Sequence, residues 1–595
     1  MSQCLLAAPC HSPRDSGGDC RTDDVFDFIV VGGGTAGAVV ASRLSEISSW
    51  NVLLLEAGAD KTMSAAVPAL YLNLQKTGMD WELETQRDEG MYNGLTGRVN
   101  RWPRGKVLGG TSAINAMIYI RGGKRDYDNW AADGNAGWSY EDVLPLFKKS
   151  EDMRDMSVVH SETFCKYHSR GGPLTVSRFG SDEPIIKVIQ DAGMELGYAS
   201  NFDMNSVGKT GFTSPSQGGI KVGERFDTAD AFLSPARHRK NLFVIKHALV
   251  TKIHISPKNK RAFAVSYLWK QEKIERTLRA SREIIVCAGT VGSAKLLMLS
   301  GIGPKHTLED VGIDVIQELK VGRNLQDHVM FFGAPITLSP VKHTGVELLE
   351  EMDSAYEYLT RRTGPLATIG VSELVGFVST TDEDIPDLQL SFENYMDLNS
   401  KWDLLLPIVV LVQPKSRGTI KLKSCNPSDP PLIRPEYMTE PQDLETMLQG
   451  IRWLERLVKT EAMSAFDANI RRMNFPGCCN LEFDSDAYWA CAISHLSGTF
   501  FDPVGTCRMG PRSDPTAVVD QCLKVHNVKG LRVADASIMP TIVTGNTYAA
   551  CVMIGEKVSE LIKIQWLGQK CHSSTMKQRF DNAVRLPYTP STEGH

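Results

Sequence analysis

The sequence predicts an α/β fold with two parts: a discontinuous, doubly wound domain and a second domain built on an antiparallel sheet with covering helices. Three observations predict it. Strand–helix segments at residues 25–60, 283–303 and 530–563 have the pattern of βαβ units, although they lie far apart in the chain. A doubly wound sheet needs these segments side by side, so the first domain must be discontinuous. Residues 335–495 instead contain alternating strands such as "DLQLSFENY" and "TIKLKS", which are typical of an antiparallel sheet.

The length and composition fit a large protein with two structural units, or with one unit that carries an inserted lobe. The chain has 595 residues, of which 42% are hydrophobic, and its formal net charge is -5. That charge gives no electrostatic reason to expect nucleic acid or an anionic membrane surface as a partner. No stretch approaches the roughly 20 apolar residues that cross a bilayer.

The two ends of the chain, residues 1–24 and 564–595, are polar and irregular, and we expect mobile tails there. The first residues lack the charged start and apolar run of a signal peptide, and no Asn-x-Ser/Thr acceptor occurs, so a cytoplasmic location is favoured. The 13 cysteines are spread without zinc-type spacing. We therefore expect free thiols rather than a disulfide framework, and no metal site.

The first motif is "DFIVVGGGTAGAVVASRLSEISSWNVLLLEAG", from Asp27 to Gly58. An apolar strand leads into Gly32-x-Gly34-x-x-Gly37, a helical pattern follows, and a second apolar strand ends at Glu56. Gly32 permits a tight turn, Gly34 lets the backbone approach a pyrophosphate, and Gly37 lets helix and strand pack closely. The acid at position 56 is placed to bind a ribose diol. Strand, glycines, helix, strand and acid in this order predict a dinucleotide site, but they do not separate NAD from FAD.

Four further segments carry a family resemblance: "PRGKVLGGTSAINAMIYIRG" (103–122), "GTVGSAKLLMLSGIG" (289–303), "VGRNLQDHV" (321–329) and "GLRVADASIMPTIVTGNTYA" (530–549). Together they resemble the glucose–methanol–choline (GMC) oxidoreductases, which bind FAD. The chain looks most like the insect branch with glucose dehydrogenase (FAD, quinone)-like and ecdysone oxidase-like members. The second segment departs from the family pattern at Ala294, where a proline or serine is usual.

The resemblance implies a discontinuous FAD-binding Rossmann-like domain at 25–334, a substrate-binding domain at 335–495, and a return segment at 496–563 that completes the FAD domain and the active site. Some relatives attach FAD covalently through a histidine at the position of Asn115, so non-covalent FAD is expected here. Val250 is placed near the adenine and Asp535 near the ribityl chain. The residues expected to hold FAD are Gly32, Gly34, Thr35, Ala36, Gly37, Glu56, Arg104, Gly110, Thr111, Asn115, Ala116, Met117, Ile118, Val250, Asp535, Ala536, Asn546 and Thr547.

The segment "SGTFFDPVGTCRMGP" (497–511) departs from the family at the catalytic position. In the family a histidine precedes "PVGTC", and a His or Asn follows about 44 residues later. The histidine takes or shares the proton of the substrate hydroxyl while hydride goes to flavin N5. In this chain the first position is Asp502 and the second is Asn546.

Three interpretations of Asp502 remain open. In the first, Asp502 is itself the base, although it is shorter than histidine and its negative charge opposes an anionic reduced flavin. In the second, another group substitutes, and His495 is the nearest candidate in the sequence. In the third, the chain is a non-catalytic or repurposed FAD-binding protein that has lost alcohol oxidation.

The function expected from the resemblance is FAD-dependent oxidation of a CH–OH group in a small alcohol, sugar or ecdysteroid. Electrons would pass to a quinone-like acceptor or to O2. Asp502 and Asn546 are the candidate catalytic residues. The partners expected are therefore the alcohol substrate and an electron acceptor.

Overall fold

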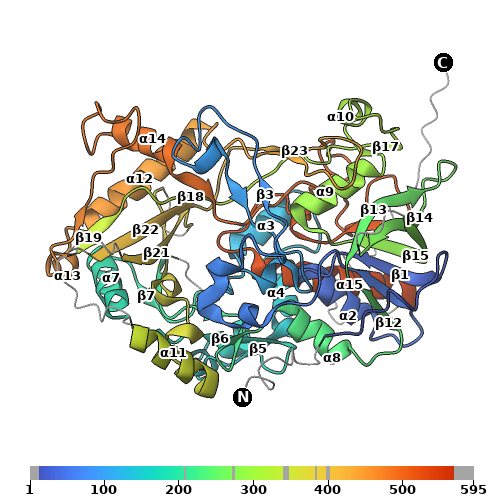
Figure 1. Cartoon of the computed structure of the whole chain (residues 1–595), viewed down its shortest axis with the longest axis horizontal. Coiled ribbons are helices and arrows are strands. Elements are labelled where there is room, and N and C mark those ends of the chain that lie inside the picture. Colours follow the sequence, from blue (N-terminus) through green and yellow to red (C-terminus); the bar gives the residue numbers. More distant parts are fainter. Residues whose placement is uncertain are drawn as a thin grey trace.

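The structure is a computed structural model that describes residues 12–181, 183–206, 210–270, 275–338, 348–381, 385–396 and 403–568. It has two lobes that lie side by side. One lobe contains β1 and β13–β15, and the other contains β21 and β22 (Figure 1). Residues 1–11 of the first expected tail and residues 569–595 of the second lie outside the described residues.

The first lobe is built on a seven-stranded sheet. The strand order is β12-β2-β1-β15-β14-β13, and β27 also pairs with β15. The bounds are β1 Val25–Val31, β2 Val52–Leu55, β12 Leu242–Ile245, β13 Ala248–Ile255, β14 Ala262–Trp269, β15 Arg276–Val286 and β27 Leu531–Val533. Strand β1 is parallel to both β2 and β15, and β15 is parallel to β27. The three βαβ-like segments therefore meet in one sheet, which confirms the predicted discontinuous fold.

Burial explains why these strands are almost wholly apolar. Residues 28–31 of β1 and all four residues of β2 are at most 4% exposed. Parallel strands covered on both faces need such continuous apolar runs. The helix after β1 is α2 (Thr35–Leu44), and it packs against α15 (Tyr548–Leu567). A Cβ at Gly555 of α15 would lie 2.8 Å from the Ala36 carbonyl oxygen, so a glycine is needed for this close approach.

The second lobe is built on a nine-stranded sheet in the order β25-β19-β22-β21-β20-β8-β7, with β18 pairing β22 and β26. The bounds are β7 Ser200–Asn201, β8 Gly211–Thr213, β18 Val329–Phe331, β19 Ile336–Leu338, β20 Val375–Val378, β21 Leu388–Met396, β22 Asp403–Leu411, β25 Asn469–Ile470 and β26 Ser497–Thr499. Most of its pairs are antiparallel, as predicted. The sheet also takes strands from outside the expected range 335–495, namely β7, β8, β18 and β26.

Helices α12 (Pro441–Leu457) and α14 (Asp486–His495) belong to this second lobe, and α12 packs on β22. The second sheet therefore has a covering helix, as predicted for this domain. Strand β23 (Thr419–Lys421) pairs with β24 (Leu432–Arg434) in a separate small sheet. No helix in the described part of the chain is long and apolar enough to span a membrane.

Strand β22 runs without a break through Pro407, a residue type that is usually excluded from central strands. Pro407 pairs with Phe392 of β21 in the middle of a continuous nine-residue strand. On the other side of β22, residues 403–405 pair with β19 and residues 409–411 pair with β18. Pro407 falls between these two partners, where no neighbouring strand needs its missing N–H.

Two expectations about the periphery are corrected. Residues 12–24 are placed against the first sheet, where the Ser16 amide donates to the Val244 carbonyl at 2.7 Å. At the other end, α15 continues to Leu567, past the expected start of the tail at 564. In addition, Cys478 and Cys491 form a disulfide, so the expectation of free thiols is wrong for this pair.

Candidate functional site

One large cavity, with a volume of about 940 Å³, takes its walls from both lobes. Of all the site residues expected from the sequence, only Gly37 does not line it. The lining residues that were expected are Gly32, Gly34, Thr35, Ala36, Glu56, Arg104, Gly110, Thr111, Asn115, Ala116, Met117, Ile118, Val250, Asp502, Asp535, Ala536, Asn546 and Thr547. The structure therefore brings together segments that span more than 500 positions of the sequence.

The glycine-rich turn places the start of α2 at this cavity. Gly34 is the N-cap of the helix, and no side chain caps it. The first amides of α2 are therefore left to bind an anion, which the helix dipole also favours. Gly32 has a φ of 100°, a conformation that favours glycine. A Cβ on Gly37 would lie 1.9 Å from the Gly32 carbonyl oxygen, so Gly37 serves the packing of helix on strand rather than the cavity wall.

Glu56 stands at the end of β2, at the carboxyl edge of the parallel strands. Its two oxygens accept hydrogen bonds from the amides of Gly33 and Gly58, each at 2.7 Å. Burial raises the pKa of Glu56 to about 7, against the lowering effect of these two amides. A fixed carboxyl group at this edge suits the diol of a ribose.

The segment 109–117 forms a second wall beside the glycine turn. A Cβ on Gly110 would lie 2.5 Å from the Cα of Gly34, so the two backbones touch and leave no room for a side chain between them. The Asn115 side chain accepts bonds from the Met117 amide and from Arg225, both at 2.9 Å. Asn115 is thus held by the protein, and an amide at this position offers no nucleophile for covalent attachment of a cofactor.

Asp535 follows β27 at the carboxyl edge of the same sheet. It accepts bonds from the amides of Gly289 and Ser537, each at 2.9 Å, and from the Ser293 hydroxyl. Burial raises the pKa of Asp535. Val250, on β13, lines the cavity with its neighbours Ala248 and Leu249.

Asp502 lies just beyond β26 and faces the cavity, but most of its hydrogen-bonding capacity is already used. Its Oδ1 accepts bonds from the Thr547 amide at 3.1 Å and from the Thr547 hydroxyl. Its Oδ2 lies 3.1 Å from Nδ1 of His328. Its own amide donates to Asp327 Oδ1 at 3.0 Å. The carboxylate is therefore held in one orientation at the wall of the cavity.

His328 is the histidine that accompanies Asp502, and sequence reasoning missed it. It is fully buried, and its Nε2 lies 3.0 Å from the Val543 carbonyl oxygen. The only signal for it was its place in "VGRNLQDHV", which was recognised as a family segment without a role for this residue. His495, the candidate chosen by sequence proximity, does not line the cavity. Its ring packs on Phe475, and its Nδ1 lies 2.8 Å from the Cys491 carbonyl oxygen.

Asn546 adds an amide beside Asp502, and its Oδ1 is buried without a hydrogen-bond partner among the described residues. A buried polar atom of this kind usually has a partner, so a ligand is expected to supply one. The Arg104 guanidinium also lines the cavity and donates to the Phe501 carbonyl at 2.6 Å. Burial lowers the pKa of Arg104, while the charges of Asp327 and Asp502 act in the opposite direction.

The second sheet contributes a polar group that the sequence did not reveal. Glu393, on β21, lines the cavity, and its Oε1 accepts bonds from the hydroxyls of Tyr71, at 2.9 Å, and Ser372. Burial raises the pKa of Glu393. Ser391 lies two residues earlier and also lines the cavity. Their alternation with apolar neighbours was visible in "DLQLSFENY", but the sequence could not tell a cavity from solvent on the polar face.

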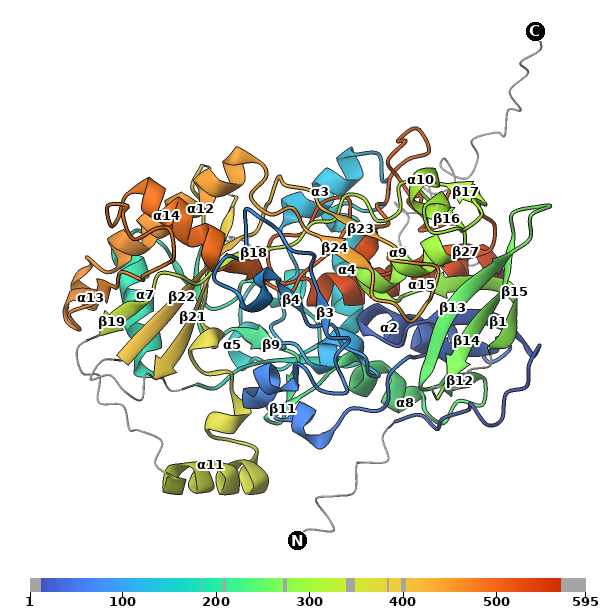
Figure 2. The same ribbon diagram turned by 45° about the horizontal axis from the view of Figure 1, so that its top comes forward.

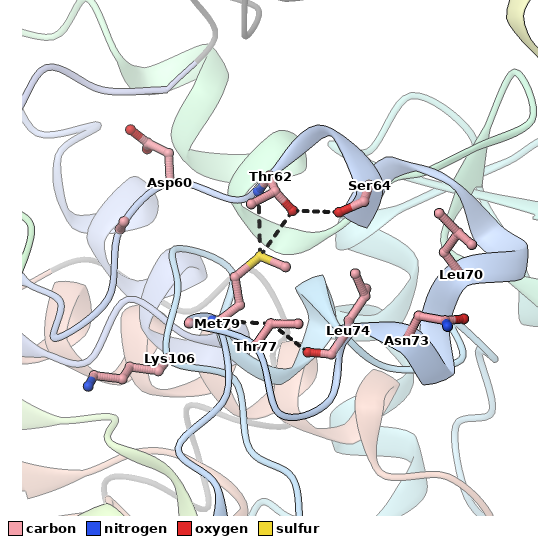
Figure 3. A pocket seen from close by; sticks show the side chains of 11 residues that line it. Asp60, Thr62, Ser64, Leu70, Asn73, Leu74, Thr77, Met79 and Lys106 are labelled. Carbon is pink, nitrogen blue, oxygen red and sulfur yellow. Dashed lines mark hydrogen bonds between the residues drawn. The ribbon is translucent and has the colours of Figure 1, made fainter.

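A second, smaller cavity of about 350 Å³ lies near the loop 59–79. Figure 3 shows Thr62 bonded to Ser64 and to the sulfur of Met79, while Lys106 extends to one side. None of the expected catalytic residues lines it. Asp502 and Asn546 both line the larger cavity instead.

One corner of the second lobe groups three potential metal ligands: Cys478, Cys491 and His495. It is the only such group in the described ranges. The two cysteines are joined in a disulfide, so neither sulfur is available as the thiolate that binds a metal.

The residues around the large cavity fit FAD. An uncapped helix start and two touching glycine backbones leave space for a pyrophosphate, Glu56 stands where a ribose would lie, and Asn546 has an unmatched amide oxygen. The apolar walls at Val250 and at Ala116–Ile118 suit flat aromatic rings.

Comparisons with known proteins agree with this arrangement. The N-terminal GMC oxidoreductase family model matches residues 26–330, and the C-terminal model matches residues 414–555. The chain is 40% identical to glucose dehydrogenase [FAD, quinone] of Drosophila melanogaster, over 95% of this chain and 91% of the relative. It is 34% identical to ecdysone oxidase of Bombyx mori, over 94% of this chain and 85% of the relative.

Solved structures show the same fold. Formate oxidase of Aspergillus oryzae superposes with a TM-score of 0.81 at 28% identity, over 92% of this chain and all of the other. Pyridoxine 4-oxidase of Mesorbium loti superposes with a TM-score of 0.77 at 27% identity, with the same coverage. The chain therefore belongs to the GMC oxidoreductase family and is an FAD-dependent oxidoreductase.

Proposed function

We propose that this protein oxidises a CH–OH group in an alcohol, sugar or ecdysteroid, with Asp502 as the proton acceptor and Asn546 as a second contact to the reacting hydroxyl. The observation that carries this proposal is that both side chains line the cavity that also holds the glycine turn, Glu56 and Asp535. A carboxylate and an amide converge there on the site of an FAD.

Asn546 and Asp502 have different roles in the proposed reaction. Asn546 lines the cavity, and its side-chain NH2 group would donate to the oxygen of the donor hydroxyl, while its unpaired Oδ1 is left to accept a bond from another group of the ligand. Asp502 is fixed by Thr547 and His328, and it takes the hydroxyl proton as the carbonyl product forms. When bound, FAD supplies the acceptor for the hydride that leaves the same carbon. The electrons then pass to a quinone-like acceptor or to O2.

The segments that hold the cofactor would be the start of α2, Glu56, the 110–118 wall and Asp535. Asn115 leaves the FAD non-covalent, because its side chain is an amide already engaged by Arg225. FAD released by heat or acid and recovered unmodified in the supernatant is the expected result.

The second candidate is a flavoprotein that has lost alcohol oxidation. The observation that favours it is the carboxylate at position 502, because a lone negative charge would oppose reduction of a nearby flavin. The two candidate functions require the same FAD-binding residues. They differ only in whether a donor can reduce the flavin.

The test is anaerobic reduction of the purified flavoprotein. We expect the flavin absorbance near 450 nm to bleach with at least one donor from a panel of alcohols, sugars and ecdysteroids. Reoxidation by O2 and by a soluble quinone, measured on the reduced protein, then identifies the acceptor. A protein that keeps tightly bound FAD, is reduced by dithionite and responds to no donor would overturn the proposal in favour of the second candidate.

The variant Asp502→His tests whether the carboxylate at position 502 is required or merely tolerated. If the carboxylate is merely tolerated, this variant is reduced faster than the wild type. If the carboxylate is required, turnover of the native donor is lost. His495→Gln is the control, because His495 does not line the cavity and its substitution should leave reduction unchanged.

A further inference from the structure

We propose that Asp502 and His328 act as one proton-holding pair, in which His328 is a positioning residue that cancels the negative charge of Asp502 in the resting enzyme. This inference rests on the proposed function for its kinetic consequences. Its central claim concerns charge, and that claim can be measured without any donor.

The hydrogen bonds of His328 fix how many protons the pair holds. Its Nε2 lies 3.0 Å from the Val543 carbonyl oxygen, which can only accept, so Nε2 carries a hydrogen. Its Nδ1 lies 3.1 Å from Asp502 Oδ2. If Nδ1 were unprotonated and Asp502 ionised, two lone pairs would face each other at that distance. A second proton must therefore lie between the two side chains, and the pair as a whole is neutral.

The hydrogen bonds of Asp502 show that the pair can accept a further proton. A carboxylate offers about four lone-pair positions. The Thr547 amide and hydroxyl occupy two of them, and His328 occupies a third. One position remains, and Asp502 lines the cavity in which the donor binds. Thr547 and His328 also fix the direction in which that position points.

The charge balance follows from this count. An alcohol that becomes a carbonyl loses a hydride, which carries two electrons to FAD, and a proton, which goes to Asp502. The pair then changes from neutral to a single positive charge, beside a flavin that has gained electrons. A lone aspartate would instead change from negative to neutral and would begin by repelling the added electrons. His328 therefore removes the electrostatic objection to a carboxylate at this position.

The other ionisable groups around the pair do not take over this role. Asp327 accepts the Asp502 amide bond, and burial raises its pKa to about 6. Cys551 lies near Asp502, and burial raises its pKa to about 12. Arg104 faces both aspartates, and Tyr437 donates to Asp327. Among the described residues the His328 ring bonds only to Asp502 and to the Val543 carbonyl, so a pH dependence that His328→Gln removes is assigned to the Asp502–His328 pair.

The first experiment measures the reduction potential of the bound flavin in the wild type and in His328→Gln, by equilibration with a reference dye. Glutamine keeps a hydrogen bond but cannot carry the charge. In His328→Gln we expect the equilibrium between oxidised and reduced flavin to shift at least tenfold toward the oxidised form. For a two-electron couple this shift makes the reduction potential about 30 mV more negative. His495→Gln is the matched control and should not shift the potential.

The second experiment measures the pH profile of flavin reduction by the best donor. In the wild type we expect the rate to fall at alkaline pH as the pair loses its proton, and we expect His328→Gln to remove this alkaline limb. A purely structural role for His328 would lower the rate at every pH and leave the shape unchanged. An unchanged potential together with an unchanged profile would overturn the proposal.

The rescue experiment uses Asp502→His in the His328→Gln background. A single imidazole at position 502 can hold the proton alone, so the double variant should recover the potential lost by His328→Gln. Failure to recover it in a folded, FAD-loaded protein would count against the pair. If His328→Gln does not fold, Asp502→Asn tests the pair from its other side. It should remove the alkaline limb because the amide cannot hold the extra proton on His328.

The proposed function and this inference fail in different ways. If no donor reduces the wild type but the potential shifts as described, the pair exists and alcohol oxidation is wrong. If donors reduce the wild type and His328→Gln alike, with the same potential and pH profile, the function stands and the pair is wrong.

Discussion

At the scale of single residues, the proposed function depends on Asp502. It is fixed by Thr547 and His328, and it has one acceptor position left for a donor hydroxyl. In Asp502→Asn the proton acceptor is lost while the size of the side chain is kept. We expect the limiting rate of flavin reduction to fall by roughly 10²–10⁴-fold, the usual worth of a general base.

Stopped-flow reduction under anaerobic conditions measures this loss, and the FAD content of the purified variant serves as its control. Asp520→Asn is a matched substitution at an aspartate that does not line the cavity, and it should reduce at the wild-type rate. Equal reduction rates for Asp502→Asn and wild type would show that Asp502 takes no proton.

The sequence predicted the position of Asp502 and Asn546 because both lie in motifs with fixed spacing. It could not predict His328 as the partner of Asp502, because the two residues are 174 positions apart and meet only through the pairing of β18 with β26. Sequence proximity offered only His495, seven residues from Asp502, as a substitute for the missing histidine. Nearness in the chain was a poor guide here because α14 ends at His495, and its ring turns toward Phe475.

At the scale of elements, β21 places the polar side chains of Ser391 and Glu393 on the face that lines the cavity. Glu393 keeps Oε1 for Tyr71 and Ser372, and its Oε2 has no hydrogen bond among the described residues. Strand β21 lies three strand spacings, roughly 14 Å, from β26, which leads to Asp502. Glu393 is therefore placed to bind a part of the donor remote from the reacting hydroxyl.

Glu393→Gln tests this placement. We expect binding of a polyhydroxylated donor to weaken by roughly 10–100-fold, since a hydrogen bond to a charged group is worth about 1.5–3 kcal/mol. The limiting rate of flavin reduction should stay within about twofold, because the variant leaves the reacting end intact. Saturation curves of reduction rate against donor concentration separate the two quantities. Glu445→Gln, at an exposed glutamate of α12, is the control. A lower limiting rate with unchanged affinity would contradict the assignment.

The junction between β1 and α2 depends on Gly37. A Cβ at this position would lie 1.9 Å from the Gly32 carbonyl oxygen, a backbone atom that cannot move aside without opening the turn. We expect Gly37→Ala to lower the free energy of unfolding by about 1–3 kcal/mol or more, as overpacking does, and to weaken FAD binding. Thermal unfolding and FAD titration of the apoprotein measure both effects. Gly78→Ala, where nothing lies within 4 Å of the added Cβ, should change neither.

Elements with a strong periodic pattern were predicted well, and those shaped by their neighbours were not. The apolar runs of β1 and β2 and the helix α12 were read directly from the sequence. Proline is usually excluded from central strands, but β22 tolerates Pro407 because it faces the gap between β18 and β19. The gap between β18 and β19 exists only in the assembled sheet. The local sequence around Pro407 therefore cannot predict it.

At the scale of the whole molecule, the discontinuous first domain was predictable because each βαβ-like segment had its own signal. The contributions of β7, β8, β18 and β26 to the second sheet were not, because strands of two or three residues carry almost no periodicity. The disulfide was equally hidden, because spacing alone does not show that α14 brings Cys491 to Cys478.

A buried charge network joins distant parts of the molecule. His168 lies 3.1 Å from Glu151, at the start of β5 (Glu151–Met153), and 3.0 Å from Asp203. Arg121 donates to the same Glu151 at 2.6 Å. Burial opposes the charged form of His168, but its hydrogen bonds to Asp203 and Glu151 outweigh that effect and raise its pKa. The network thus favours a charged histidine inside the protein, where an uncompensated charge would be costly.

This network makes stability depend on pH in a definite direction. A histidine whose pKa is raised in the folded protein contributes its full stabilisation below the unfolded pKa of about 6.5 and loses it as the pH rises through the folded value. We therefore expect the Tm to fall as the pH is raised from 6 toward 9. His168→Gln should lower the free energy of unfolding at pH 6 by roughly 1.5–3 kcal/mol for each charged hydrogen bond that glutamine fails to replace. The Tm at pH 6 should fall accordingly, and its decline between pH 6 and 9 should become flatter. Calorimetry across this range measures both effects, with the exposed His160→Gln as control. An equally steep decline in His168→Gln would assign the pH dependence to another group.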